Sequence, residues 1–176
     1  MTKKIIAIVP AAGLGKRFSA SIKKTFADLD NIPLLIHTLK RLSSEKLITD
    51  IIPALREEDI ENSFQIINEH GVGKIKKIAP GGKERQDSIY NALKLLEQRA
   101  IDPEDIILIH DGARPFIPDG LVPSLISELE NFDGVIPGTP VKETLKEVSA
   151  EGVIISTIDR DKFRSVQTPQ AFTFRV

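Results

Sequence analysis

The chain has 176 residues, of which 41% are hydrophobic and 28% charged, a balance typical of one globular domain with a sizeable core. Its formal net charge is -1, so phosphate groups would have to be bound by locally placed cations, and nucleic acid is not an expected partner. The chain has no cysteine, which excludes disulfides, zinc–thiolate sites and thiol nucleophiles and suits the cytoplasm.

The elements expected in chain order alternate between strands and helices. An apolar run at 5–9 predicts a strand buried on both faces, and it meets Pro10 too early for a signal peptide or a membrane span. Apolar residues spaced i, i+4, i+7 indicate helices around 35–42, 60–67 and 89–96, with strands at 51–55, 74–79 and 106–110. This alternation predicts an α/β fold in three layers, a mainly parallel twisted sheet flanked by helices, with ligands beyond the carboxyl ends of the strands.

One segment breaks the alternation. Two strand-like runs, 144–148 and 153–158, flank a turn of Ser, Ala, Glu and Gly, which predicts a projecting β-hairpin arm. An isolated hairpin is only marginally stable and its valines and isoleucines need cover, so we expect it to pack on a second copy of the chain, giving a homodimer. The alternative is an arm folded back on its own sheet. We therefore expect a single domain over residues 1–176, with 140–165 as the dimerising arm.

A loop of small residues follows the first predicted strand, and it consists of Pro10, Ala11, Ala12, Gly13, Leu14, Gly15, Lys16 and Arg17. Small side chains let backbone N–H groups approach an anion, and Lys23 and Lys24 add further cations. The dinucleotide fingerprint fails because Phe18 stands where its third glycine is needed, and the P-loop fails because its glycine spacing is absent. We interpret the loop as a polyphosphate cradle; the alternative is that its glycines only make a tight turn.

Four segments together resemble the 2-C-methyl-D-erythritol 4-phosphate cytidylyltransferase family. They lie in the family's order and approximate spacing, at 9–18 (VPAAGLGKRF), 81–88 (GGKERQDS), 110–115 (HDGARP) and 168–170 (TPQ). The resemblance implies a Rossmann-like nucleotidyltransferase fold with a dimerising β-arm. It also implies a reaction of CTP with 2-C-methyl-D-erythritol 4-phosphate, in isoprenoid biosynthesis by the non-mevalonate route, that gives 4-diphosphocytidyl-2-C-methyl-D-erythritol and pyrophosphate.

The resemblance also implies roles for individual residues. Arg17 and Lys24 match the catalytic cations that stabilise charge on the α-phosphate and the departing pyrophosphate. The nucleotide-binding positions are Pro10, Ala11, Ala12, Gly13, Leu14, Gly15, Lys16, Gly81, Gly82, Arg85 and Ser88. The substrate-binding positions are Asp111, Arg114, Thr144, Arg160 and Thr168. Of these, Thr144 and Arg160 reach across to bind the sugar phosphate in the neighbouring subunit's site, with Arg160 as a fork on its phosphate oxygens.

The residue types suit phosphoryl chemistry. A phosphate monoester is already ionised near neutral pH, because its second pKa is about 6, so no general base is required. Repulsion between two anions is the obstacle, and cations, a metal ion and in-line positioning overcome it. Asp111, at the carboxyl end of the predicted strand 106–110, is the expected ligand of Mg²⁺ or another divalent cation, whereas we expect His110 to serve packing or hydrogen bonding.

The chain departs from the family's pattern at three places. Lys23 stands where proline commonly precedes the matched lysine, Lys83 stands where some members carry an acidic group, and the family normally continues beyond the present terminus with another lysine near the transferred phosphate. Three alternatives therefore stay open: a ribitol 5-phosphate cytidylyltransferase, a CTP-binding module without turnover, and the front half of a two-enzyme fusion. Read alone, Arg85 could be a surface residue, and Asp111 and Ser88 could be turn or cap residues.

Overall fold

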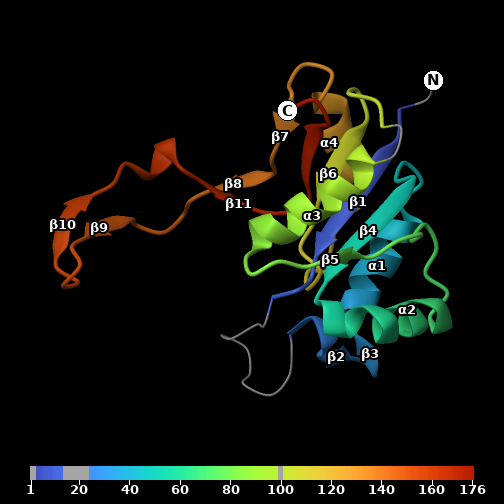
Figure 1. Ribbon diagram of the computed structural model, residues 1–176. Coiled ribbons are helices and arrows are strands. Elements are labelled where there is room, and N and C mark those ends of the chain that lie inside the picture. Colours follow the sequence, from blue (N-terminus) through green and yellow to red (C-terminus); the bar gives the residue numbers. More distant parts are fainter. Residues whose placement is uncertain (1–2, 14–23, 99–100) are drawn as a thin grey trace.

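Six strands form one sheet in the order β5-β4-β1-β6-β12-β7 in the computed structural model, which describes residues 3–13, 24–98 and 101–176 (Figure 1). The strands β5 (Ala79–Pro80), β4 (Asp50–Leu55), β1 (Ile5–Pro10) and β6 (Ile106–Ile109) pair in parallel. Next to them, β12 (Gln170–Thr173) runs antiparallel to both β6 and β7 (Gly134–Val135). The predicted mainly parallel sheet is confirmed.

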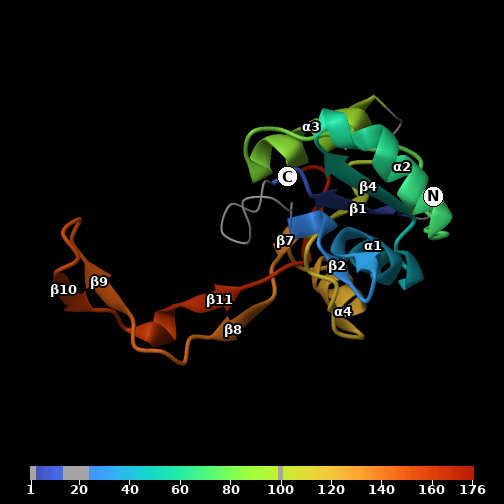
Figure 2. The same cartoon turned by 90° about the horizontal axis from the view of Figure 1, so that it is seen from below.

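Helices cover both faces of this sheet, as predicted (Figure 2). The three expected helices are α1 (Leu34–Ser44), α2 (Ile60–Glu69) and α3 (Arg85–Glu97). Successive strand residues point to opposite faces, so Ala7 and Val9 pack with α1, α2 and a further helix at 121–128, whereas Ile6 and Ile8 pack with α3. The helix α4 (Leu121–Glu128) was not predicted, because it has only eight residues and carries Pro123 in its first turn.

The predicted strand at 74–79 is much shorter in the structure. Regular pairing is confined to β5, and a single isolated bridge joins Ile75 to Ile51. Lys74 has a left-handed backbone with φ 65°, and the next two lysines are exposed, so the run cannot alternate as a half-buried strand does. Short elements complete the body: β2 (Asp28–Leu29), β3 (Ile32–Pro33), η1 (Lys24–Phe26) and η2 (Glu57–Asp59). In the described ranges, no helix combines the length and apolarity needed to span a bilayer.

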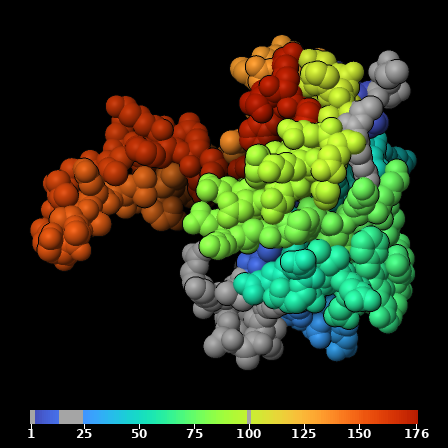
Figure 3. All heavy atoms as spheres, viewed as in Figure 1, coloured from blue at the N-terminus to red at the C-terminus, as the bar shows by residue number. Residues whose placement is uncertain are grey.

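A long arm leaves the body between β7 and β12 (Figures 1 and 3). At its root β8 (Gly138–Pro140) pairs with β11 (Arg164–Val166), and farther out β9 (Lys146–Val148) pairs with β10 (Ile154–Thr157), followed by η3 (Arg160–Lys162). The predicted hairpin is therefore present, with strands slightly shorter than expected. It does not fold back on its own sheet: Val153, Ile154 and Ile155 are 65%, 61% and 62% exposed.

Candidate active site

A cavity of about 320 Å³ opens at the carboxyl ends of β1 and β6, beside the N-terminus of α3. Its walls come from three loops and from η1, and the lining residues are Pro10, Ala11, Ala12, Gly13, Thr25, Gly82, Lys83, Glu84, Arg85, Ser88, Asp111, Gly112 and Ala113. In a parallel sheet flanked by helices, this edge is where ligands bind, because the loops that leave adjacent strands diverge there. The position of the cavity follows directly from the strand order.

The first wall is the start of the small-residue loop that follows β1. The backbone N–H of Ala11 donates to the carbonyl of Ala54 at 2.9 Å, and Arg56 Nε donates to the carbonyl of Ala12 at 3.0 Å, so neighbouring strand β4 holds the loop in place. A Cβ placed on Gly13 would meet no atom of the described residues within 4 Å. Packing against the described part of the chain therefore does not require glycine here, where Gly13 lines the cavity.

The second wall is the loop that joins β5 to α3. Gly81 lies so close to the first loop that a Cβ on it would stand 2.2 Å from the Cβ of Ala12. The Ser88 hydroxyl accepts from the Gly82 N–H at 3.0 Å and donates to the Glu84 carbonyl at 3.2 Å, so it shapes the loop from within. Glu84 and Asp87 form a reciprocal capping box at the start of α3. A Cβ on Gly82 would stand 2.1 Å from the Cβ of Asp87, so close approach requires glycine at both positions, and the start of α3 is capped as the alternative interpretation expected.

The third wall carries one carboxylate between two guanidinium groups. Asp111 Oδ1 accepts from Arg85 Nε and Asp111 Oδ2 accepts from Arg114 Nε, each at 2.9 Å. The backbone N–H of Asp111 donates to Thr168 Oγ1 at 3.3 Å, and Arg114 Nη1 donates to Gln167 Oε1. Two arginines and one aspartate leave one net positive charge beside the cavity, as a site for phosphate groups requires.

His110 supports this wall from the core. It is 1% exposed, and its Nε2 lies 2.8 Å from the carbonyl of Arg114, which makes Nε2 the protonated nitrogen because a carbonyl only accepts. Burial lowers the pKa of the His110 imidazole below its ordinary value, and Nδ1 has no partner within the described chain. A neutral, buried ring that holds the 111–114 turn fits the packing and hydrogen-bonding role expected from the sequence.

The structure brings together much of the predicted site. Pro10 to Gly13, Gly82, Arg85, Ser88 and Asp111 line one cavity, Gly81 supports it from behind, and Arg114 and Thr168 contact Asp111. Leu14, Gly15, Lys16 and Arg17 lie outside the described residues, as does the side chain of Lys24, whose backbone begins η1.

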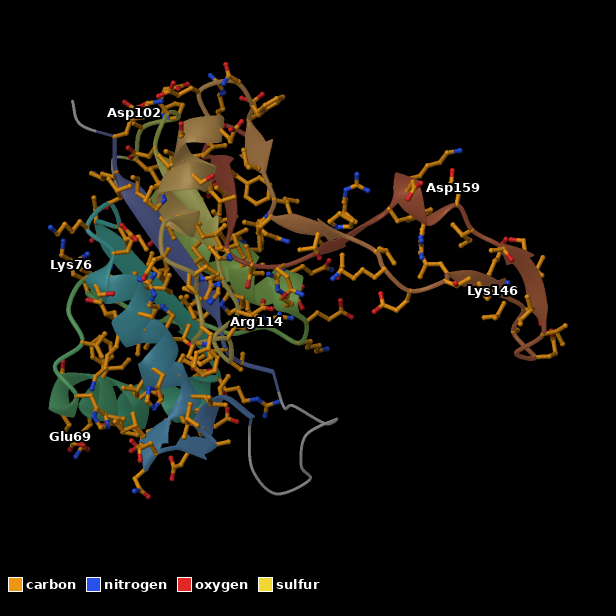
Figure 4. The ribbon with its side chains drawn as sticks, turned by 180° about the vertical axis from the view of Figure 1, so that it is seen from behind. Glu69, Lys76, Asp102, Arg114, Lys146 and Asp159 are labelled. Carbon is orange, nitrogen blue, oxygen red and sulfur yellow. The ribbon has the colours of Figure 1, made fainter. Side chains whose placement is uncertain are left out.

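Two predicted substrate positions lie on the arm and do not line the cavity of their own chain. Thr144 lies between β8 and β9, and Arg160 begins η3, where its Nη1 donates to the carbonyl of Lys142 at 2.6 Å. Figure 4 shows their neighbours Lys146 and Asp159 far out on the arm, whereas Arg114 lies in the body. The structure thus places these two residues apart from the cavity that their own chain forms.

Several cavity residues were not among the predicted site residues. Lys83, Glu84, Gly112 and Ala113 lie inside the motifs at 81–88 and 110–115, so motif membership was the available signal. Arg56 does not line the cavity but holds its first loop; it directly follows β4, and the rule that ligand loops follow parallel strands could have found it. Nothing in the sequence marks Thr25, which the fold buries next to the first loop, where Thr25 Oγ1 donates to the carbonyl of Ala11 at 3.4 Å.

The residues around Asp111 do not form a metal site by themselves. Across the described segments, no group of three or more His, Cys, Asp or Glu side chains is placed to hold an ion. Both oxygens of Asp111 already accept hydrogen bonds from arginine. Mg²⁺ can bind through one carboxylate and several phosphate oxygens, so Asp111 as its ligand remains a prediction that requires the nucleotide to supply most of the coordination.

This combination of fold and cavity defines a class: a nucleotide-binding α/β domain whose ligand loops follow β1, β5 and β6 and whose cavity carries cations for phosphate groups. Residues 5–176 match the family model described as 2-C-methyl-D-erythritol 4-phosphate cytidylyltransferase. The chain belongs to this family.

Individual relatives agree with the match. The chain is 38% identical to a 2-C-methyl-D-erythritol 4-phosphate cytidylyltransferase of Clostridium botulinum, over 100% of this chain and 75% of the relative. The solved structure of a 4-diphosphocytidyl-2C-methyl-D-erythritol synthase from Anaerococcus prevotii superposes with TM-score 0.78 and 32% identity, over 98% of this chain and 72% of that one. A bifunctional IspDF from Campylobacter jejuni superposes with TM-score 0.77 and 26% identity, and the chain covers 42% of its length.

Proposed function

We propose that the protein transfers a cytidylyl group from CTP to 2-C-methyl-D-erythritol 4-phosphate, releasing pyrophosphate, in isoprenoid biosynthesis. The observation that carries the proposal is the meeting of three of the family's four motifs in one cavity, with the fourth, at Thr168, bonded to the wall that bears Asp111. The names of the relatives supply the two substrates.

The chemistry requires little from the protein beyond charge and alignment. An oxygen of the acceptor's phosphate monoester attacks the α-phosphorus, a new P–O bond forms, and the bond from the α-phosphorus to the bridging oxygen breaks as pyrophosphate leaves. The attacking oxygen is already deprotonated near neutral pH, so the site needs no general base. The barrier is reduced by holding the two groups in line and by neutralising the charge that gathers around the phosphorus.

The loops of the cavity divide these tasks. The loop at Pro10 to Gly13 offers bare backbone to the triphosphate, and Arg17 and Lys24 are the proposed cations for the α-phosphate and the leaving group. The loop at 81–88 is the proposed seat of the cytosine base. Arg114, on the wall that bears Asp111, is bonded to Asp111 through Nε and to Gln167 through Nη1, and its remaining N–H groups are the proposed contact for the acceptor's phosphate.

Nucleotide and acceptor preferences test the proposal directly. Pyrophosphate release should be fastest with CTP, compared with ATP, GTP and UTP, when methylerythritol phosphate is the acceptor. Ribitol 5-phosphate in place of methylerythritol phosphate should give little product. A preference for ribitol 5-phosphate would mean that the protein is a ribitol 5-phosphate cytidylyltransferase. If calorimetry shows CTP binding while phosphorus NMR shows no product, the protein is a CTP-binding module without turnover.

We also propose a homodimer in which each arm completes the partner's site. Val148, Val153, Ile154 and Ile155 of the hairpin are 55–65% exposed. Exposure of these apolar side chains to water is unfavourable, and an isolated hairpin is only marginally stable. Thr144 and Arg160 lie on the same arm, away from the cavity of their own chain. A second subunit would cover the apolar residues and receive both polar ones.

Mixing two inactive variants separates a shared site from an independent one. Arg17→Ala disables the cavity but leaves the arm intact, and Arg160→Ala does the reverse. If sites are shared, a mixed dimer contains one complete site, and co-refolded protein should regain up to about a quarter of wild-type activity, since half of the dimers are mixed and each has one of two sites. No recovery, or a monomer by light scattering at micromolar concentration, would refute the shared site.

Mg²⁺ or another divalent cation is the proposed cofactor, and when bound it would neutralise phosphate charge. No step above depends on it. We also propose that the protein works in the cytoplasm. Disulfides rarely form there, so a chain without cysteine lacks no stabilising bond that this compartment would allow.

A further inference from the structure

Arg114 is held from two different elements of the fold. Its Nε donates to Asp111 Oδ2 at 2.9 Å, within the same turn, and its Nη1 donates to Gln167 Oε1, which is 53 residues away in the sequence. A guanidinium group bonded at one nitrogen can still rotate about that bond. Bonds at two nitrogens fix the plane of the group, which matters for recognition of phosphate.

Gln167 is itself well placed to act as an anchor. It directly follows β11, where the return strand of the arm rejoins the body, and its backbone N–H donates to the carbonyl of Pro137 at 3.0 Å. The next residue, Thr168, accepts from the backbone N–H of Asp111 at 3.3 Å. Two consecutive residues therefore reach the same turn, and β12 pairs with β6 immediately afterwards, with Gln170 opposite Ile109.

The chemical type of this anchor is informative. An amide oxygen accepts the guanidinium N–H without adding charge, whereas a carboxylate at the same place would cancel the one net positive charge of the Arg85, Asp111 and Arg114 group. The two bonds use two of the five guanidinium N–H groups of Arg114, and its side chain is 51% exposed. Up to three N–H groups thus remain for an anion from solvent.

We propose that Gln167 is a positioning residue that orients Arg114 for the phosphate of the acceptor. The inference rests on the proposed function, because it assigns the acceptor side of that same site. Gln167 does not touch the reacting atoms; it acts through Arg114. It also ties the root of the arm to the cavity wall, so that the arm's attachment and the orientation of Arg114 share one contact.

The test compares Gln167→Met, which keeps the length of the side chain but lacks the amide acceptor, with the wild-type protein. Loss of one hydrogen bond to a charged group predicts a rise in KM for methylerythritol phosphate of about tenfold, with KM for CTP within about twofold. Gln167→Glu should hold Arg114 but repel the acceptor, so it should raise the same KM and no other. The matched control is Gln65→Met: Gln65 also makes a side-chain bond, to Glu69 on α2, and does not line the cavity.

A double variant shows whether Gln167 acts through Arg114. If it does, Arg114→Ala with Gln167→Met should be no worse than Arg114→Ala alone, since nothing remains to be oriented. Full additivity, or an equal loss of affinity for both substrates, would overturn the inference. Gln167→Ala repeats the comparison with a smaller side chain in case the Met variant unfolds. If the wild type itself transfers no cytidylyl group, the proposed function fails and not this inference alone.

Discussion

Substitution by alanine should have opposite effects at Gly13, which lines the cavity, and at Gly81, which supports it from behind. At Gly81 an added Cβ would stand 2.2 Å from Ala12 Cβ and 3.1 Å from the carbonyl oxygen of Leu55, and neither neighbour can rotate away. Overpacking of this kind costs about 1–3 kcal/mol of unfolding free energy. For a chain of this size, a loss of about 2 kcal/mol lowers the melting temperature by about 4–8 °C. At Gly13, by contrast, the added Cβ would meet no atom of the residues that the structure describes within 4 Å.

Gly13→Ala should therefore keep the melting temperature of the wild type and impair only the binding of CTP. If the methyl group keeps one backbone N–H from a phosphate, KM for CTP should rise about tenfold. Thermal unfolding and initial-rate kinetics on both variants distinguish the two cases. A destabilised Gly13→Ala variant, or one with unchanged KM for CTP, would refute the idea that this glycine serves the ligand rather than the fold.

The remaining predictions address charge and assembly. Arg17→Ala and Lys24→Ala should each lower kcat about 100-fold or more, because a transition-state contact with developing charge contributes roughly 3–4 kcal/mol, while thermal unfolding stays near wild type; variants that keep full turnover would remove both from catalysis. Asp111→Asn keeps one accepting oxygen and replaces the other by a donor, so one of the two arginines loses its partner, and KM for the acceptor should rise several-fold in steady-state assays; a variant with unaltered kinetics would show that the carboxylate does not organise the arginines. Val153→Lys with Ile155→Lys should turn the dimer into a monomer in light scattering, and a dimer that persists would place the interface elsewhere.

Local patterns in the sequence determined the framework of this protein. Continuous apolar runs identified β1 and β6, and helical spacing identified α1, α2 and α3, since these periods depend only on backbone geometry and on which face is buried. The hairpin of the arm followed from its turn composition. Where the pattern was weak it misled: residues 74–79 yielded only a two-residue strand, and α4 was too short to recognise.

Tertiary structure alone decided which side chains share the cavity wall. Arg85, from the first turn of α3, and Arg114, from the loop after β6, donate to the two different oxygens of Asp111. Gln167, at the root of the arm, accepts from Arg114. These residues are separated by up to 82 positions in the sequence. These contacts depend on the order of strands in the sheet and on the pairing of β12 with β6, both of which are set by contacts between residues distant in the sequence. Sequence periodicity reports only on neighbours within one element, so it contains no record of those contacts.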